Sequence, residues 1–171
     1  MSFQHTHTTS SFSVKKFPIV LVCDGVQSPS NIGSLFRTCD ALGVSEIVFC
    51  NSGLNINSSR LQKTARSTQK RVSFSESNNI IKTIEEFKQK GFNPIALEIT
   101  DNSIPLEKLS LPINENVVLI IGNEKLGISK KVLKYISLSV HINMFGDNSS
   151  MNVVQATSIA LHSIINKLYI Y

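Results

Sequence analysis

The sequence predicts an α/β domain with a mostly parallel sheet flanked by helices. Short apolar runs alternate with amphipathic segments along the chain, the pattern of strands separated by helices. No run approaches the ~20 apolar residues of a membrane-spanning helix, so we expect no membrane association. The chain has 171 residues, 42% of them hydrophobic, which is the size of one domain, expected over residues 15–171.

The elements follow from this alternation. Runs rich in Val and Ile, such as IVLVC, EIVFC and VVLII, predict buried strands. The expected strands are Ile19–Asp24, Glu46–Phe49, Val72–Phe74, Pro94–Ile99, Val117–Ile121 and Ser139–Ile142. Segments with apolar residues at helical spacing predict helices. The expected helices are Asn31–Leu42, Asn57–Thr68, Asn79–Lys90, Ser129–Tyr135 and Met151–Leu168.

The first and last of these helices carry further information. The first follows Pro29 and is expected to be capped by Ser30 or Asn31, with its apolar residues in one arc. At about 100° per residue, Arg37 points away from that arc. The last helix is apolar around much of its circumference. It therefore lies either at the centre of the domain or in a subunit interface.

Residues 1–14 and the cysteines limit the class of protein. Residues 1–14 have neither the apolar stretch nor the cleavage-site pattern of a signal peptide, so we expect a disordered polar tail and a cytoplasmic protein. Cys23, Cys39 and Cys50 are odd in number and show no C-x-x-C spacing. We expect each to be a small core residue, with no disulfide framework and no metal site.

The positive charge is concentrated in one segment. The chain carries a formal net charge of +5, and residues 60–90 contain eight basic and three acidic residues. That segment therefore accounts for the whole excess of positive over negative charge. It indicates either a surface for a polyanion, with nucleic acid as the first candidate, or an ordinary solvated helix face.

The common nucleotide and hydrolase motifs are absent from the sequence. There is no G-x-G pair, no G-x-S-x-G and no H-E-x-x-H. Gly122 and Gly127 have the spacing of a phosphate loop, but no lysine follows to bind the phosphates. The missing lysine argues against the alternative of a nucleotide-binding α/β protein that uses this loop.

Three polar segments begin where predicted strands end, which is where open α/β sheets bind ligands. They are SPSNIGSLFRTCDALGV, IIGNEKLGIS and HINMFGDNSSMNVVQA. Arg37 and Glu124 lie in these segments and are candidate site residues. The alternative for Arg37 is an ordinary surface arginine, and the alternative for Glu124 is a carboxylate that caps the turn after Gly122. The polar cluster before the last helix exceeds what a helix cap needs.

Together these segments resemble the three motifs of the SpoU/TrmH branch of the SPOUT RNA methyltransferases. NIGSLFRTCDALGV resembles the first motif with its N-x-G-x-x-x-R core, LIIGNEKLGIS the second with G-N-E, and HINMFGDNSSMNVVQA the third with S-[L/M]-N. The resemblance covers residues 18–168. Asn143 stands where the family usually has proline, and Met151 where leucine is commoner.

The resemblance implies a SPOUT-type domain with a C-terminal trefoil knot that binds S-adenosyl-L-methionine, uses no metal and works as a homodimer. The activity implied is methylation of a ribose 2′-hydroxyl of structured RNA, with tRNA as the expected substrate. The alternatives are an rRNA 2′-O-methyltransferase or a non-catalytic RNA-binding member of the same fold.

The resemblance also implies the site residues. The catalytic set is Arg37, Asn31, Glu124, Ser150 and Asn152. The cofactor set is Leu97, Gly122, Ile142, Ser150 and Met151. Arg60, Lys63 and Arg66, at helical i, i+3, i+6 spacing, are the expected contacts to RNA phosphates.

Distinct roles are expected within the catalytic set. Arg37 would grip a phosphate and stabilise alkoxide charge, because a guanidinium is a poor general base. Asn31 would orient Arg37 or the ribose, and Glu124 would hold either Arg37 or its loop. Ser150 and Asn152 would position the ribose or shape the cofactor loop.

Overall fold

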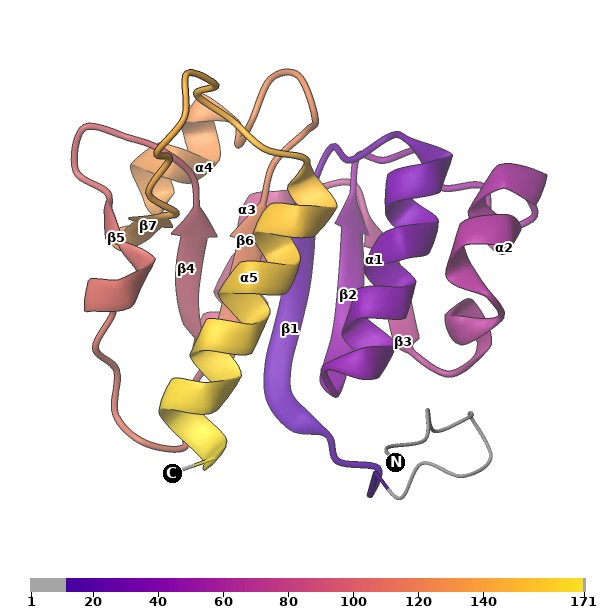
Figure 1. Cartoon of the computed structure of the whole chain (residues 1–171), viewed down its shortest axis with the longest axis horizontal. Coiled ribbons are helices and arrows are strands. Elements are labelled where there is room, and N and C mark those ends of the chain that lie inside the picture. Colours follow the sequence, from indigo (N-terminus) through magenta and orange to yellow (C-terminus); the bar gives the residue numbers. More distant parts are fainter. Residues whose placement is uncertain (1–11, 171) are drawn as a thin grey trace, which may run out of the picture.

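The computed structural model describes residues 12–170, and its strands form one parallel sheet with the order β3-β2-β1-β6-β4-β7-β5 (Figure 1). The fold class expected from the sequence is therefore confirmed. Residues 1–11 of the expected polar tail lie outside the described residues, and residues 12–14 are exposed without regular structure. Within the described range, no helix has the length and apolarity needed to cross a membrane.

Strands and helices alternate through most of the chain. The strands are β1 (Phe17–Asp24), β2 (Val44–Cys50), β3 (Ser73–Ser77), β4 (Asn93–Leu97), β5 (Ile104–Pro105), β6 (Val117–Ile121) and β7 (Ser139–His141). The helices are α1 (Pro29–Ala41), α2 (Ser59–Ala65), α3 (Ile80–Gln89), α4 (Lys130–Tyr135) and α5 (Val153–Ile165), which continues as a π-helical turn (Asn166–Ile170). Every predicted strand and helix is present.

The structure adds one strand and moves several boundaries. β5 has only two residues, too few to show a periodic pattern, and it pairs with β7 at the edge of the sheet. Helix α1 begins at Pro29, before the predicted Asn31, and its cap is neither Ser30 nor Asn31 as expected: the Ser28 hydroxyl accepts a hydrogen bond from the Asn31 N–H and caps the helix. Helix α5 begins at Val153, two residues after the predicted Met151.

Helix α2 is shorter than predicted. Arg66 and Ser67 have positive φ values of 50° and 68°, a conformation that cannot continue a right-handed helix. A 3₁₀ turn (Thr68–Lys70) follows. The predicted helix to Thr68 is therefore wrong in its last turn, and Arg66 does not continue the helical row of Arg60 and Lys63.

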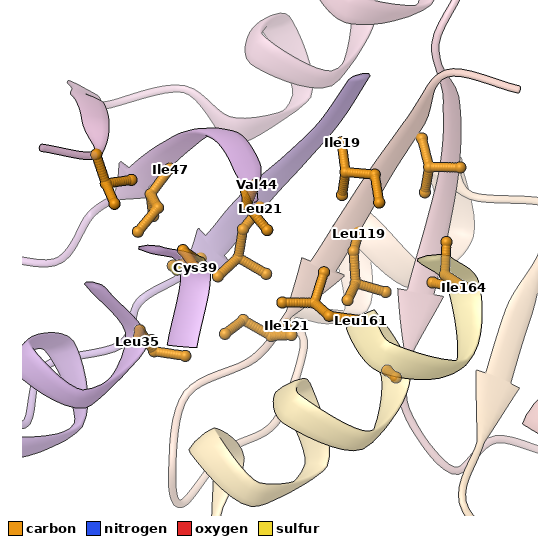
Figure 2. Packing of buried hydrophobic residues seen from close by; sticks show 14 of the residues in the cluster. Ile19, Leu21, Leu35, Cys39, Val44, Ile47, Leu119, Ile121, Leu161 and Ile164 are labelled. Atoms are coloured by element: carbon orange, nitrogen blue, oxygen red, sulfur yellow. The ribbon is translucent and has the colours of Figure 1, made fainter. Parts of the chain in front are cut away.

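Hydrophobic side chains cover both faces of the sheet, as in parallel sheets with helices on each side. On one face, Ile19, Leu21 and Leu119 pack beneath α1 and α5, where Leu161 points toward the strands (Figure 2). On the other face, alternate residues of the same strands pack with α3 and α4. In Figure 1, α1 and α5 lie in front of the sheet and α3 and α4 behind it.

All three cysteines are buried and free, so their prediction as core residues is confirmed. Burial raises the pKa of the Cys23 and Cys39 thiols and brings the pKa of the Cys50 thiol to about 11. Raised thiol pKa values keep these side chains uncharged at neutral pH, which suits a small apolar core residue.

Because all the strands are parallel, their carboxyl ends share one edge of the sheet. The three motif segments begin in or beside the loops that follow β1, β6 and β7, and the first of them continues through α1. These loops lie at that edge of the sheet, at the top in Figure 1. Strand β6 lies between β1 and β4, although β4 precedes β6 in the sequence. This order brings the segments together over the centre of the sheet.

Candidate active site

A cavity of about 770 Å³ opens at the carboxyl ends of β4, β6 and β7. Its walls come from the end of β4, the turn after β6, the loop between β7 and α5, and helices α4 and α5. All the predicted cofactor residues line it: Leu97, Gly122, Ile142, Ser150 and Met151. The volume lies within the usual range of small-ligand pockets.

Gly122 makes the floor of this cavity possible. The following turn closes on itself, with Asn123 and Gly127 exchanging backbone hydrogen bonds of 3.0 and 2.9 Å. A Cβ atom at Gly122 would lie 2.1 Å from the Gly127 carbonyl carbon and 2.2 Å from the Ile128 nitrogen. Any side chain would therefore displace the turn, so the tight bend requires glycine.

Asn123 holds the turn in shape. Its Oδ1 accepts hydrogen bonds from the N–H groups of Lys125 and Leu126, at 2.9 and 3.1 Å, and its Nδ2 donates to the Gly25 carbonyl at 2.6 Å. The turn-capping role that was an alternative for Glu124 thus belongs to Asn123.

Glu124 instead reaches back to the loop between β1 and α1. Its carboxylate accepts hydrogen bonds from the N–H groups of Gln27 and Ser28, at 3.3 and 3.0 Å, and from Asn31 Nδ2 at 3.1 Å. Of the two roles expected for Glu124, it performs the second, because it holds the loop. No carboxylate within residues 12–170 forms an ion pair with Arg37.

These hydrogen bonds keep Glu124 charged. Partial burial raises the pKa of the carboxyl. Hydrogen bonds from its own backbone N–H, from the Asn31 amide and from the N–H groups of Ser28 and Gln27 together lower the pKa by more than burial raises it. The net result is a pKa below the ordinary value of a glutamic acid. Glu124 is therefore a charged hydrogen-bond acceptor at neutral pH and not a proton donor.

Asn31 also contacts the third segment. Its Oδ1 accepts a hydrogen bond of 3.3 Å from Asn152 Nδ2. Asn152 Oδ1 in turn accepts the Val154 N–H at 2.9 Å and caps α5. Hydrogen bonds therefore join Glu124, Asn31 and Asn152, one residue from each motif segment. Glu124 and Asn152 both line the cavity, and Asn31 lies between them.

Arg37 is exposed on α1, as its helical position predicted. It lies about 9 Å further along the helix axis than Asn31, and neither residue lines the cavity. Asn31 makes its hydrogen bonds to Glu124 and Asn152 and none to Arg37, so the structure does not show the orienting contact expected between them. Arg37 is a free cation on the α1 surface of the described chain.

The predicted RNA contacts lie on a different part of the surface. Arg60 and Lys63 are exposed on α2, and Arg66 is exposed directly after it. None of them lines the cavity. Helix α2 packs against α1 at the side of the domain (Figure 1). The structure therefore separates these side chains from the cavity.

Sequence reasoning missed Glu98 and Asp24. Glu98 follows β4, and its carboxylate accepts the N–H groups of Ile99 and Ile128, both at 3.0 Å. The buried Asp24 at the end of β1 accepts the Ser129 N–H at 2.8 Å. Both carboxylates thus fix the chain that leaves the turn after β6. A carboxylate at the end of a buried strand is the signal that could have found them.

Two lysines at the cavity were also missed. Residues 125–134 contain four lysines and no acidic residue. Lys125 and Lys130 line the cavity, and both are exposed. The net charge of residues 60–90 equals the net charge of the whole chain, because the basic and acidic residues elsewhere are equal in number. A sum of charges therefore does not reveal the lysines at the cavity.

Comparisons with known proteins identify one family. The model of the SpoU rRNA methylase family matches residues 18–162. The chain is 26% identical over 145 residues to the 23S rRNA (guanosine(2553)-2′-O)-methyltransferase of Bacillus subtilis, a match that covers 85% of this chain and 57% of that relative. The chain thus spans little more than half the length of this curated relative.

Two solved structures share the fold. The TrmH/SpoU tRNA modifying enzyme of A. aeolicus has a TM-score of 0.80 at 24% identity, over 90% of this chain and 77% of its own. The AdoMet-bound rRNA methyltransferase from Sinorhizobium meliloti also has a TM-score of 0.80, at 21% identity, over 92% of this chain and 59% of its own.

Proposed function

The chain belongs to the SpoU rRNA methylase family, and on that basis we propose that it transfers a methyl group from S-adenosylmethionine to a ribose 2′-hydroxyl of RNA. One observation carries the proposal. Hydrogen bonds join Glu124, Asn31 and Asn152 from three distant segments at the mouth of a cavity of ligand size. Such a network fixes the three loops relative to one another, as positioning of a reactive pair requires.

The cavity suits S-adenosylmethionine. Leu97, Ile121 and Ile142 offer apolar walls for an adenine ring, and the bend at Gly122 brings backbone groups close to the ligand. The relative from Sinorhizobium meliloti carries AdoMet in its structure, which supports the assignment. When bound, this cofactor supplies a methyl group that is already activated. The protein residues then need mainly to align the RNA hydroxyl and to manage its proton.

We assign those tasks to the catalytic set. Arg37 grips an RNA phosphate and stabilises negative charge that develops on the ribose oxygen, while the phosphate or a water accepts the hydroxyl proton. Glu124 holds the loop that begins α1, and Asn152 fixes the start of α5. Ser150, exposed at the cavity, contacts the ribose.

A homodimer is part of the proposal. Helix α5 buries one side against the sheet, while Ile159 on its outer side keeps 44% of its surface exposed. Helices α1 and α5 lie side by side, with the hydroxyls of Thr38 and Ser158 3.2 Å apart (Figure 1). A second copy that covers this face would bury Ile159. Light scattering should show a dimer for the wild type and a weaker one for Ile159→Asp.

The proposed substrate is tRNA. In support, the tRNA modifying enzyme of A. aeolicus is matched over a larger share of its length than the two enzymes named for rRNA. Mapping 2′-O-methyl groups in total RNA from cells with and without the gene tests the choice. Loss of a tRNA site supports the proposal, and loss of an rRNA site replaces tRNA with rRNA.

The trefoil knot also stays a proposal. Strand β6 lies on one side of β4, and β5 and β7 lie on the other, so the chain passes β4 between β5 and β6 and again between β6 and β7. This order supports threading of the last segment through an earlier loop. A crystal structure with a continuous trace would test it directly.

The activity itself is tested with purified protein. Isothermal titration calorimetry with S-adenosylmethionine measures cofactor binding, and transfer of a labelled methyl group to bulk tRNA and rRNA measures the reaction. Methyl transfer that Arg37→Lys reduces would support the role assigned to Arg37. RNA binding without methyl transfer would instead identify a non-catalytic member of the fold.

A further inference from the structure

Three separate loops that border the cavity expose large apolar side chains. Ile99 follows β4, Leu126 lies in the turn after β6, and Phe145 lies in the loop between β7 and α5. Their exposed fractions are 57%, 85% and 96%. Ile99 and Leu126 line the cavity, as does Met144, the neighbour of Phe145. These residues form an apolar rim around the site.

The packing of the domain does not account for an aromatic residue at Phe145. Its ring belongs to neither hydrophobic core and forms no aromatic pair within residues 12–170. An aromatic side chain left in water forgoes the burial that normally stabilises it. Phe145 is therefore available to a partner that reaches the mouth of the cavity.

The charges at the rim favour a polyanion with apolar faces. Lys125 and Lys130 line the cavity and are exposed. Residues 125–134 contain four lysines and no acidic residue. The carboxylates of Glu98 and Glu124 point at backbone N–H groups, to which they are hydrogen-bonded, and Asp147 lies in the loop of Phe145. Lysines and an exposed aromatic ring on the loops of one cavity are the composition of a single-stranded nucleic acid surface.

We propose that Phe145 is a stacking platform for an unpaired base of the RNA, next to the nucleotide whose ribose enters the cavity. The inference rests on the proposed function and narrows its substrate to an unpaired stretch. In a duplex each base face is covered by its neighbours, so only an unstacked base can lie on the Phe145 ring. Lys125 and Lys130 bind the adjoining phosphates.

A second copy of the chain fits this rim less well than RNA. A symmetric contact across the rim would place Lys125 and Lys130 near their own copies, and the like charges would repel. Burying the apolar side chains in such a contact would also bury the lysines or bring their like charges together, and both are unfavourable. RNA can cover the Phe145 ring with a base and pair its phosphates with the lysines.

Fluorescence anisotropy tests the proposal with a short labelled RNA, either single-stranded or annealed to its complement. Phe145→Ala should weaken binding of the single strand about tenfold and leave duplex binding unchanged. Phe145→Trp should restore the preference for the single strand. Ile113→Ala, which removes an exposed apolar side chain from the loop before β6, serves as the matched control and should change neither affinity.

Three results would overturn the inference. Equal weakening for single strand and duplex would show that Phe145 does not contact a base face, and unchanged binding would show that it contacts no RNA. Conversion of a dimer to a monomer by Phe145→Ala, seen by light scattering, would assign the ring to a subunit interface. Calorimetry with S-adenosylmethionine and methyl transfer by the wild type report separately on the proposed function.

Discussion

Asn31 Nδ2 donates a hydrogen bond of 3.1 Å to the Glu124 carboxylate, although 93 residues separate the two in sequence. The same amide accepts a hydrogen bond from Asn152 through its oxygen. Asn31 thus uses both ends of its side chain to connect the loop after β6 with the start of α5. Substitutions at this connection, in the cavity beneath it and on the surfaces beside it should have distinct effects.

Asn31→Ala should remove the connection and leave the fold intact, because Asn31 is only half-buried and lies outside the hydrophobic core. With the loops no longer held together, we expect kcat/KM for methyl transfer to fall about 100-fold. Asn78→Ala, at an exposed position remote from the cavity, is the control and should keep the wild-type rate. A wild-type rate for Asn31→Ala would refute the positioning role.

The stabilising contribution of Glu124 should depend on pH in a defined direction. Because its pKa is lowered in the folded protein, the contribution is fully present above the ordinary pKa of glutamic acid, about 4.3, and disappears as the pH falls through the lowered value. Urea unfolding should therefore show a constant difference between wild type and Glu124→Gln at neutral pH. The difference should shrink only below about pH 4.

Glu85→Gln provides the comparison, because Glu85 is exposed and makes no ion pair among the described residues. Its unfolding free energy should follow that of the wild type at every pH. A difference for Glu124→Gln that grows toward acid would contradict the lowered pKa.

Gly122→Ala should damage the cavity selectively. The added Cβ would overlap Gly127 and Ile128, and the turn that forms the cavity floor must move. We expect the Kd for S-adenosylmethionine to rise more than about tenfold, which corresponds to over about 1.4 kcal/mol. Gly146→Ala is the matched control, because a Cβ there meets no atom within 4 Å. Equal affinities of the two variants would exclude this role for the bend at Gly122.

The two basic surfaces should contribute separately to RNA affinity. Each lysine or arginine that contacts a phosphate steepens the dependence of affinity on salt by roughly 0.7 to 0.9 in the logarithmic slope. Replacing Lys125 and Lys130 with Gln should flatten the slope, and so should replacing Arg60, Lys63 and Arg66. Lys108→Gln, exposed and remote from the cavity, should leave the slope as it is.

An unchanged slope for the Arg60, Lys63 and Arg66 variant would identify α2 as a solvated helix face. Lys125 and Lys130, together with Arg37, would then carry the electrostatic contact. Loss of affinity without any change in slope would indicate that the substitutions disturb the fold instead.

Leu119→Ala should destabilise the protein by about 3 kcal/mol. Leu119 is fully buried in β6 and packs beneath α5 (Figure 2), so its removal leaves a cavity in the centre of the domain. Ile113→Ala, on the surface, should change the free energy of unfolding by less than about 0.5 kcal/mol. Urea denaturation of the two variants gives the comparison, and similar values would contradict the packing described.

The amino-acid sequence was sufficient to predict the α/β class, the order of the long strands and helices, and the three motif segments. Runs such as VVLII report burial directly, because a strand covered on both faces must be apolar throughout. The exposure of Arg37 followed from its angle on α1, since helical geometry is local. The cofactor residues were placed by resemblance to a family, and they line one cavity.

Which polar groups pair with one another depends on the tertiary structure. Asn123 caps the turn and leaves Glu124 to hold the loop before α1, and Glu98 holds the same turn from the end of β4. Arg66 has a positive φ, which arginine does not favour, and this conformation takes it out of the helical row that Arg60 and Lys63 form. Periodicity in the sequence reports which side chains are buried. It does not report partners some 30 to 120 residues away, because the order of strands in the sheet brings those partners together.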